Sequence, residues 1–261
     1  MATVPESTFD GAAAIFAEHA KTLRGYIRYQ VEQRTLHSLL GPAPLKILDV
    51  GGGSGIDAAW LASLGYYVTI IEPSTEQQEY AQRRFNFFLN DEQRPRIRTV
   101  LGTVDNTDKQ ELASYDVVLI HGVAMLQPNP QQFISSALRY AKSGALISLL
   151  EKGYYGTEAR LIRQVKPKKL QELYLKRWMN SSIGIPVYSF KPEELEAMLL
   201  TAGALVEQWY GVRIATEDVD QRVADLDPKE VASIVDAEFE QGHDPAIRAL
   251  GQMLHFIARK N

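Results

Sequence analysis

The sequence predicts an α/β protein with a doubly wound, mostly parallel sheet of seven strands, preceded by N-terminal helices and interrupted by an insertion after strand five. Strand and helix patterns alternate from residue 45 onwards, and a glycine-rich turn, "LDVGGGSG", follows the first apolar strand. Such alternation implies right-handed crossovers and parallel strands. The chain has 261 residues, which suffices for one large domain rather than two.

Residues 8–40 are predicted to be helical and to precede the sheet. Leu23, Ile27 and Val31 recur near helical spacing, and Gly41 stands where such a helix would end. Two prolines follow within three residues and break the pattern. The sheet is therefore expected to begin directly after them.

The next hundred residues predict five strands with helices between them. The strands are apolar runs, and a capping-box pattern at Ser74 and Gln77 predicts the start of one helix. The predicted strands are 45–50, 67–72, 97–101, 117–121 and 145–150, and the predicted helices are 56–64, 74–89 and 130–140.

The alternation of strand and helix patterns stops after Glu151. Residues 152–190 are rich in aromatic and basic side chains and contain no strand signal, so we interpret them as an insertion over the sheet. A helix at 192–201 and two further strands complete the predicted fold. The two strands are 204–214 and 253–260, and an acidic helical stretch, 217–241, lies between them.

Composition narrows the class of protein. The apolar fraction of 45% is that of a globular chain, and the net charge of −4 supplies no cationic field over the whole molecule. The sequence has no cysteine, which excludes disulfides, thiolate metal sites and cysteine nucleophiles. With no leader pattern and no apolar run of membrane-spanning length, we expect a cytoplasmic protein without membrane contact.

The glycine turn distinguishes between cofactors. A dinucleotide loop needs G-x-G-x-x-G or A, and counting from Gly51 and Gly53 places Ile56 at the third position. A phosphate-binding P-loop needs Gly-Lys before Ser or Thr, and the chain has no such sequence. What remains is an acid, one spacer and G-x-G-x-G, formed by Asp49, Gly51, Gly53 and Gly55.

This pattern resembles the first motif of the class I S-adenosylmethionine-dependent methyltransferases, where the turn passes under the methionine and ribose of the cofactor. Glu72 ends the next strand, about 20 residues on, where a carboxylate would accept both ribose hydroxyls. The alternatives are that the turn is only a tight βα corner, that Glu72 is a solvated strand-end residue, and that Asp49 holds the turn through backbone amides. The resemblance implies S-adenosyl-L-methionine as cofactor and a Rossmann-like methyltransferase fold.

The implied organisation is a single domain over residues 1–261. It would comprise N-terminal helices (1–44), a cofactor-binding half (45–151), a substrate-side insertion (152–190) and a C-terminal half (191–261).

Across most of its length the chain is similar to the tRNA methyltransferases that methyl-esterify 5-carboxymethoxyuridine at the wobble position. The likeness rests on "TLRGYIRYQ", "LDVGGGSG", the strand-end acid, "LIHGV", the glycine before "ALISLL" and "GVRI". It implies the following positions for the cofactor-binding residues: Arg24 on the methionine carboxylate, Gly51 and Gly52 under the cofactor, Glu72 on the ribose, Thr103 and Val104 at the adenine, and His121 near the methionine end.

The acceptor is less well defined by the sequence. After "GVR" the chain departs from the family's aromatic and histidine residues, and its basic insertion suits either an RNA backbone with a stacked base or a soluble lid helix. We expect tRNA, through its anticodon region, or a small-molecule acceptor, and no metal. A small-molecule O- or N-methyltransferase and a non-catalytic cofactor- or RNA-binding module are the alternatives.

A carboxylate acceptor, with a pKa near 4, is already ionised at neutral pH and needs no general base. We therefore assign no catalytic residue. A cationic side chain would have to orient the acceptor, and Arg213 is the first candidate, with Arg163 and Arg177 behind it. Arg213 is equally an ion-pair candidate for the acidic segment that follows. A phenol or amine acceptor would instead require a base such as His121, Tyr154 or Tyr155.

Overall fold

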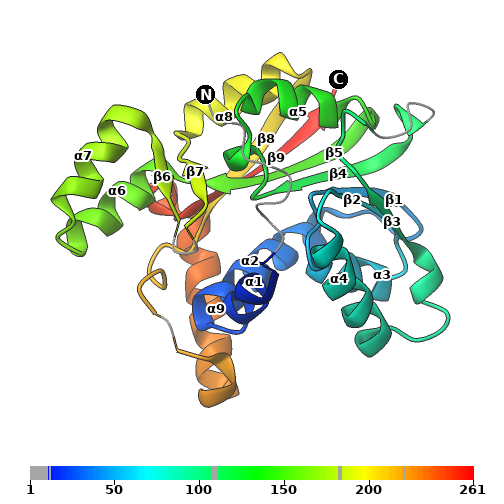
Figure 1. The fold of residues 1–261 in the computed structure, drawn as a ribbon, viewed down its shortest axis with the longest axis horizontal. Helices are drawn as coiled ribbons and strands as arrows, with labels where there is room; N and C mark the ends of the chain where they lie inside the picture. The colour runs from blue at the N-terminus through cyan, green and yellow to red at the C-terminus, as the bar shows by residue number, and fades with distance from the viewer. Residues whose placement is uncertain (1–10, 12, 107–110, 182–183, 220) are drawn as a thin grey trace.

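The computed structural model describes residues 11, 13–106, 111–181, 184–219 and 221–261 (Figure 1). Within this part of the chain, seven strands form one sheet in the order β3-β2-β1-β4-β5-β9-β8. The strands from β3 to β5 run parallel, whereas β9 pairs antiparallel with both β5 and β8. The predicted doubly wound, mostly parallel seven-stranded sheet is therefore confirmed.

The strands have the following bounds: β1 Lys46–Val50, β2 Tyr67–Glu72, β3 Ile97–Leu101, β4 Tyr115–His121, β5 Ala141–Lys152, β8 Ala204–Val212 and β9 Met253–Lys260. The helices are α1 Ala13–Ala20, α2 Leu23–Leu39, α3 Ile56–Ser63, α4 Thr75–Phe88, α5 Pro130–Leu138, α6 Tyr154–Arg163, α7 Pro167–Lys176, α8 Pro192–Thr201 and α9 Pro228–His243. Short 3-10 turns lie at Arg94–Arg96, Ala124–Leu126, Val223–Asp225 and Arg248–Leu250.

Helices cover both faces of the sheet. In Figure 1, α5 and α8 lie on one face, and α2, α3, α4 and α9 lie on the other. Consecutive β1 residues serve opposite cores, since Leu48 packs in the cluster of α5 and α8 whereas Ile47 packs in the cluster of α3 and α4. Strands buried on both faces must be apolar throughout, which is why the sequence shows continuous Val, Ile and Leu runs rather than alternation.

The N-terminal segment differs from the single helix predicted over residues 8–40. Two helices, α1 and α2, meet near Thr22, whose side chain accepts a hydrogen bond from the Gly25 amide and so begins α2. A side chain at Gly25 would collide with the carbonyl group of His19, so the two helices approach as closely as glycine permits. Residues 8–10 and 12 of the predicted helix lie outside the described residues.

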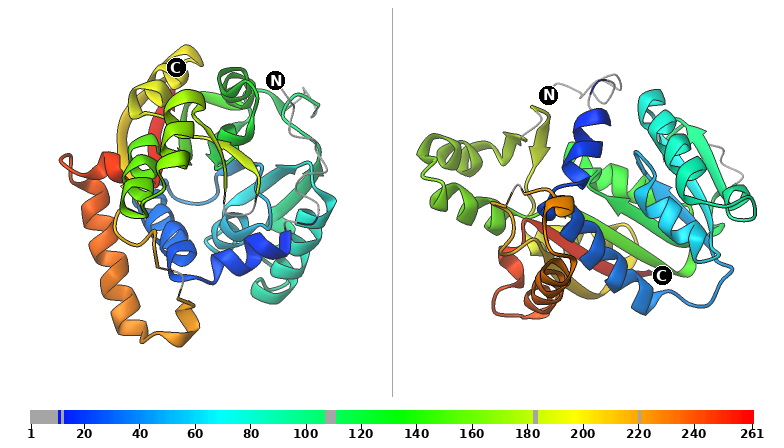
Figure 2. Two further views of the ribbon diagram at one scale, coloured as in Figure 1. Left: turned by 60° about the vertical axis from the view of Figure 1, so that its left-hand side comes forward. Right: turned by 90° about the horizontal axis from the view of Figure 1, so that it is seen from below.

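The insertion also differs from its prediction, because it contains strands. After α6 and α7, Trp178–Asn180 (β6) and Pro186–Tyr188 (β7) pair as an antiparallel hairpin. Strands of three residues are too short to produce a periodic signal in the sequence. Figure 1 and the right-hand view of Figure 2 show α6 and α7 standing apart from the helices on the faces of the sheet.

The insertion is closed at its base. Gly153, directly after β5, forms a β-bridge with Phe190, directly before α8. The Tyr154 amide donates to the Phe190 carbonyl at 2.7 Å, and the Phe190 amide donates to the Lys152 carbonyl at 2.8 Å. The two ends of the insertion are therefore held side by side.

The acidic segment is helical over only part of its predicted range of 217–241. α9 begins at Pro228, where Asp227 accepts from the Lys229 and Glu230 amides, and it extends to His243. It packs beside α2 and β8. None of the helices in the described part of the chain combines the length and apolar character that a membrane span requires.

Candidate active site

A cavity of about 280 Å³ opens at the carboxyl ends of β1, β2 and β4. Ligands of open α/β sheets bind in this position because the loops that follow the parallel strands converge there. Among the predicted site residues, those on its wall are Asp49, Gly51, Gly52, Gly53, Glu72, His121 and Arg213. Phe16 and His19 of α1 and Arg28 and Tyr29 of α2 line the cavity from the N-terminal segment.

The glycine turn forms a floor of bare backbone. Gly51 has φ +66°, and a Cβ there would lie 2.6 Å from a methyl group of Val123. A Cβ at Gly52 would lie 2.5 Å from the Asp49 carboxylate. Any side chain at either position would displace a wall residue, so the turn is built for close approach of a ligand to the backbone.

Gly55, also predicted for cofactor binding, has a different surrounding. A Cβ there would lie 2.6 Å from the Phe85 ring and 3.1 Å from the Ala81 methyl group, both on α4. Gly55 also has φ +69° at the start of α3. It permits α3 and α4 to pack together, and it does not line the cavity.

The Glu72 carboxylate is fixed at the end of β2. One oxygen accepts from the Gly53 amide at 3.0 Å and the other accepts from the Ser74 amide at 2.9 Å. Ser74 in turn begins α4 by accepting from the Gln77 amide, as the capping pattern predicted. A carboxylate oriented in this way is suited to accept hydrogen bonds from the hydroxyl groups of a ligand.

Asp49 Oδ2 and Gln77 Oε1 are buried acceptors on the cavity wall that have no hydrogen-bond partner in the described part of the chain. Buried acceptors of this kind are costly unless a ligand supplies the donor. Burial, together with the charge of Asp57, raises the pKa of Asp49 to about 7. The glycine floor and these acceptors fit a ligand with a hydroxylated and cationic surface, as S-adenosylmethionine has.

His121, at the end of β4, belongs to a buried ionic group that the sequence did not reveal. Its Nδ1 lies 2.8 Å from Glu32 Oε1 and 3.6 Å from Asp57 Oδ2, and its Nε2 lies 2.8 Å from Ser148 Oγ. Burial lowers the pKa of His121, but the two carboxylates outweigh it and raise the pKa to about 10. His121 therefore carries a positive charge between Glu32 and Asp57.

The two carboxylates respond differently to this charge. Burial would raise the pKa of Asp57, but the hydrogen bond with His121 and the charge of Arg28 lower it to about 2. Burial and the nearby Asp57 raise the pKa of Glu32. The only sequence signal was the i,i+4 spacing of Arg28 and Glu32 on α2, which surface helices also show.

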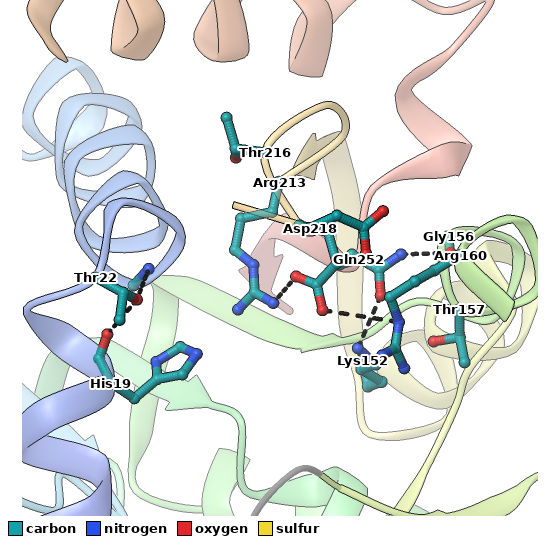
Figure 3. Close-up of polar contacts among 12 residues, drawn as sticks. His19, Thr22, Lys152, Gly156, Thr157, Arg160, Arg213, Thr216, Asp218 and Gln252 are labelled. Carbon is teal, nitrogen blue, oxygen red and sulfur yellow. Dashed lines mark hydrogen bonds and ion pairs between the residues drawn. The ribbon is translucent and has the colours of Figure 1, made fainter. Parts of the chain in front are cut away.

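Arg213 lies beside a second charged group at the mouth of the cavity (Figure 3). It follows β8, is 7% exposed and pairs with Glu217, the acidic partner that the sequence offered as an alternative role. Arg160 of α6 approaches the same carboxylate at 3.8 Å, and Lys152 ends β5 nearby. Burial and the charges of Arg24 and Arg28 lower the pKa of Arg213 to about 9.

The remaining predicted residues lie off the wall of this cavity. Arg24 is on α2 and acts electrostatically on Arg213. Thr103 and Val104 follow β3, and the Val104 carbonyl accepts from the Tyr140 hydroxyl at 3.0 Å. Arg163 forms a half-exposed ion pair with Asp218 at 3.4 Å.

Arg177 is bound within the insertion. It donates to the Ser189 carbonyl, pairs with Glu194 at 2.6 Å and stacks over the Tyr154 ring at 4.4 Å. The structure therefore brings Arg213 to the cavity without Arg163 and Arg177.

Comparison with known proteins agrees with this geometry. Residues 48–149 match the family model described as a methyltransferase domain. The chain is 22% identical over 280 aligned positions to the tRNA 5-carboxymethoxyuridine methyltransferase of Escherichia coli (strain K12), covering 98% of this chain and 97% of that protein. It is 35% identical over 132 positions to the ubiquinone biosynthesis O-methyltransferase of Rickettsia typhi (strain ATCC VR-144 / Wilmington), covering 48% and 49% respectively.

A solved structure has the same fold. The 1,6-didemethyltoxoflavin-N1-methyltransferase of Burkholderia thailandensis, with bound S-adenosylhomocysteine, superposes with a TM-score of 0.59 at 17% identity, covering 98% of this chain and 87% of that one. The matched domain contains the glycine turn, Glu72 and His121. The matched domain, the relatives and the shared fold support a class I S-adenosylmethionine-dependent methyltransferase, with S-adenosylmethionine as the cofactor.

Proposed function

We propose that the chain transfers a methyl group from S-adenosylmethionine to a carboxylate oxygen, and that the acceptor is the carboxymethoxy group of a modified wobble uridine in tRNA. The observation that carries the carboxylate is Arg213, a buried guanidinium on the wall of the cofactor cavity. Its planar donors match the two oxygens of a carboxylate. The full-length similarity to a tRNA 5-carboxymethoxyuridine methyltransferase supports the same acceptor.

In this proposal the glycine turn lies under the cofactor, Glu72 accepts its ribose hydroxyls and His121 lies at its methionine end. Arg28, which lines the cavity one turn after Arg24, becomes a second candidate for the methionine carboxylate. When bound, the cofactor supplies a methyl group on a cationic sulfur.

The protein's own contribution is alignment. Arg213 would hold one acceptor oxygen so that the other faces the methyl group, and such positioning contributes several kcal/mol to catalysis. Phe16 and Tyr29 add aromatic surface to the cavity wall, and a less polar wall would strengthen the interaction of fixed charges with the acceptor. A carboxylate is already ionised at neutral pH, so no side chain has to remove a proton.

A small-molecule O- or N-methyltransferase is the second candidate. The observation that favours it is the internal pairing of Arg163 with Asp218 and of Arg177 with Glu194, which leaves these two arginines engaged within the protein. In that case the insertion would act as a lid.

The test is methyl transfer from radiolabelled cofactor to tRNA that carries 5-carboxymethoxyuridine, followed by mass spectrometry of the nucleosides. We expect the methyl ester to appear, and we expect Arg213→Gln to abolish its formation while S-adenosylhomocysteine still binds. Arg222→Gln, which removes a half-exposed arginine paired with Glu18, is the matched control. If the intact enzyme left 5-carboxymethoxyuridine unesterified at saturating tRNA, the result would favour a small-molecule acceptor.

The pH profile separates carboxylate from phenol or amine acceptors. At saturating cofactor and acceptor we expect kcat to be constant from about pH 6 to 8, because no base has to lose a proton. We expect kcat/KM for the acceptor to fall as the pH passes about 9, because the free enzyme's Arg213 loses its charge there. A kcat that rises steeply through neutrality would contradict the base-free mechanism.

A further inference from the structure

Three cations from separate elements lie near one another where Arg213 meets the wall of the cavity. Lys152 ends β5, Arg160 lies on α6 and Arg213 follows β8. Figure 3 shows their charged ends grouped around one carboxylate, with His19 of α1 facing them. We call Lys152, Arg160 and Arg213 the cation cluster.

The acidic groups around the cation cluster are already engaged. Asp218, which acts electrostatically on Arg160, pairs with Arg163 and accepts from the side-chain amide of Gln164. Glu217 divides its carboxylate between Arg213 and Arg160. Glu238 is buried below, where one oxygen accepts from the Ile214 amide at 2.8 Å and the other accepts from the Thr216 amide at 2.7 Å. Because it accepts hydrogen bonds from these backbone amides, the Glu238 carboxylate stabilises the loop after β8.

Lys152 has no acidic partner among the residues that the structure describes. Its ammonium group donates to Gln252 Oε1 at 3.0 Å, and Gln252 is itself fixed by donating to the Gly156 carbonyl. Burial and the charges of Arg213, Arg160 and Arg24 lower the pKa of Lys152 well below its ordinary value. The fold thus holds an amine and two guanidinium groups together against their mutual repulsion.

Ion pairing inside the protein explains part of this arrangement. It accounts for the two arginines on Glu217, but within the described ranges of the chain it gives Lys152 no acidic partner. Assembling like charges in a partly buried position costs stability, and such clusters occur where a ligand of opposite charge binds. The ligand of this cluster is therefore expected to be anionic.

The donor set indicates the class of anion. A compact ammonium beside a planar guanidinium is the combination that proteins use for phosphate oxygens. Arg213 lines the cofactor cavity, whereas Lys152, at the end of β5, and Arg160, on α6, are absent from its wall. An anion bound by these two would therefore be distinct from the carboxylate that receives the methyl group.

We propose that Lys152 and Arg160 bind a phosphate group of the methyl acceptor, next to the carboxylate oriented by Arg213. This inference rests on the proposed function, because it assigns a second group of the same acceptor. Gln252 positions Lys152 through their hydrogen bond, and Glu217 positions Arg160 relative to Arg213. The phosphate belongs either to an RNA backbone or to a phosphorylated small molecule.

The test measures binding of inorganic phosphate by calorimetry to the chain saturated with S-adenosylhomocysteine, with chloride at equal ionic strength as the reference. We expect saturable binding that Lys152→Gln and Arg160→Gln each weaken about tenfold or more, as for loss of a charge-assisted hydrogen bond. Lys169→Gln, on the exposed side of α7, removes the same charge outside the cluster and should leave the affinity unchanged. All variants should bind S-adenosylhomocysteine like the parent chain, which verifies that they are folded.

Failure of phosphate to bind the parent chain, or equal binding by both cluster variants, would overturn the inference. Competition then identifies the source of the phosphate: displacement by an anticodon stem-loop RNA supports the backbone, and displacement only by uridine 5′-monophosphate supports a small acceptor. Displacement by neither would refute the assignment of the site to the acceptor. Because these measurements require no methyl transfer, an inactive tRNA assay with intact phosphate binding would reject only the proposed tRNA substrate.

Discussion

Replacing Glu72 by Ala is expected to weaken S-adenosylhomocysteine binding by roughly 1.5–3 kcal/mol, which is a factor of about ten to more than a hundred in Kd. The Glu72 carboxylate is buried, and two backbone amides fix its orientation at the end of β2. A pre-oriented carboxylate loses little conformational entropy on binding, so nearly all of the free energy of its hydrogen bonds to the ribose hydroxyls contributes to affinity. Calorimetry with purified variants measures the change.

A second ligand separates ribose contact from damage to the loop. The parent chain should bind 2′-deoxy-S-adenosylhomocysteine more weakly than the parent compound, and Glu72→Ala should remove most of that difference. Glu79→Ala, on the exposed side of α4, is the control for a lost acidic charge. An undiminished preference for the 2′-hydroxyl in Glu72→Ala would show that the carboxylate does not contact it.

Replacing His121 by Leu is expected to lower the free energy of unfolding by about 3–5 kcal/mol near pH 6, because it removes the imidazolium between the buried carboxylates of Glu32 and Asp57 and leaves Arg28, 3.6 Å from Glu32, as the cation beside them. Urea denaturation measures the loss. Asp236→Asn is the control, since it breaks an exposed ion pair with Arg34 and should change stability by less than about 1 kcal/mol. The double variant of His121→Leu with Glu32→Leu should recover part of the loss.

The same ion pair gives a pH dependence with a definite sign. The folded pKa of His121, about 10, lies above the ordinary value near 6.5, so its contribution is complete below pH 6.5 and disappears as the pH rises towards 10. The folded pKa of Asp57, about 2, lies below its ordinary value near 3.9, so its contribution is lost as the pH falls from 4 to 2. The stability gap between the parent chain and His121→Leu should therefore be widest between about pH 4 and 6.5. A gap that widens from pH 7 to 10 would contradict a charged His121.

The sequence was most informative where structure is local. The boundaries of β2, β3, α8 and β9 coincide with the predicted ranges. Each of these elements is marked by its own apolar residues and by a Pro or Gly near its end, so the signal lies within a short stretch of sequence. The glycine turn and Glu72 belong to one βαβ unit, so their spacing alone brought them together at the cavity. The hairpin of β6 and β7 had too few residues to leave a pattern.

The clusters of buried charged residues could not be predicted from local sequence patterns. Glu32, Asp57 and His121 come from α2, α3 and β4, and their convergence depends on how three elements pack. Arg160 belonged to a basic insertion that suited either an RNA backbone or a soluble lid helix, and Lys152 gave no signal, because a sequence does not state which way a side chain faces. Arg213 was found only because it follows a strand in a motif that the family shares.

The closed base of the insertion bears on how this segment can change in evolution. Because Gly153 and Phe190 are bridged, the segment between them leaves the sheet and returns to it at one point. Replacing that segment by one of different length would alter loop-closure entropy by only a few tenths of a kcal/mol for modest length changes. Exchange of the segment at this junction would replace the part that carries Arg160 and leave the cofactor half intact, so one methyl donor is compatible with different acceptors.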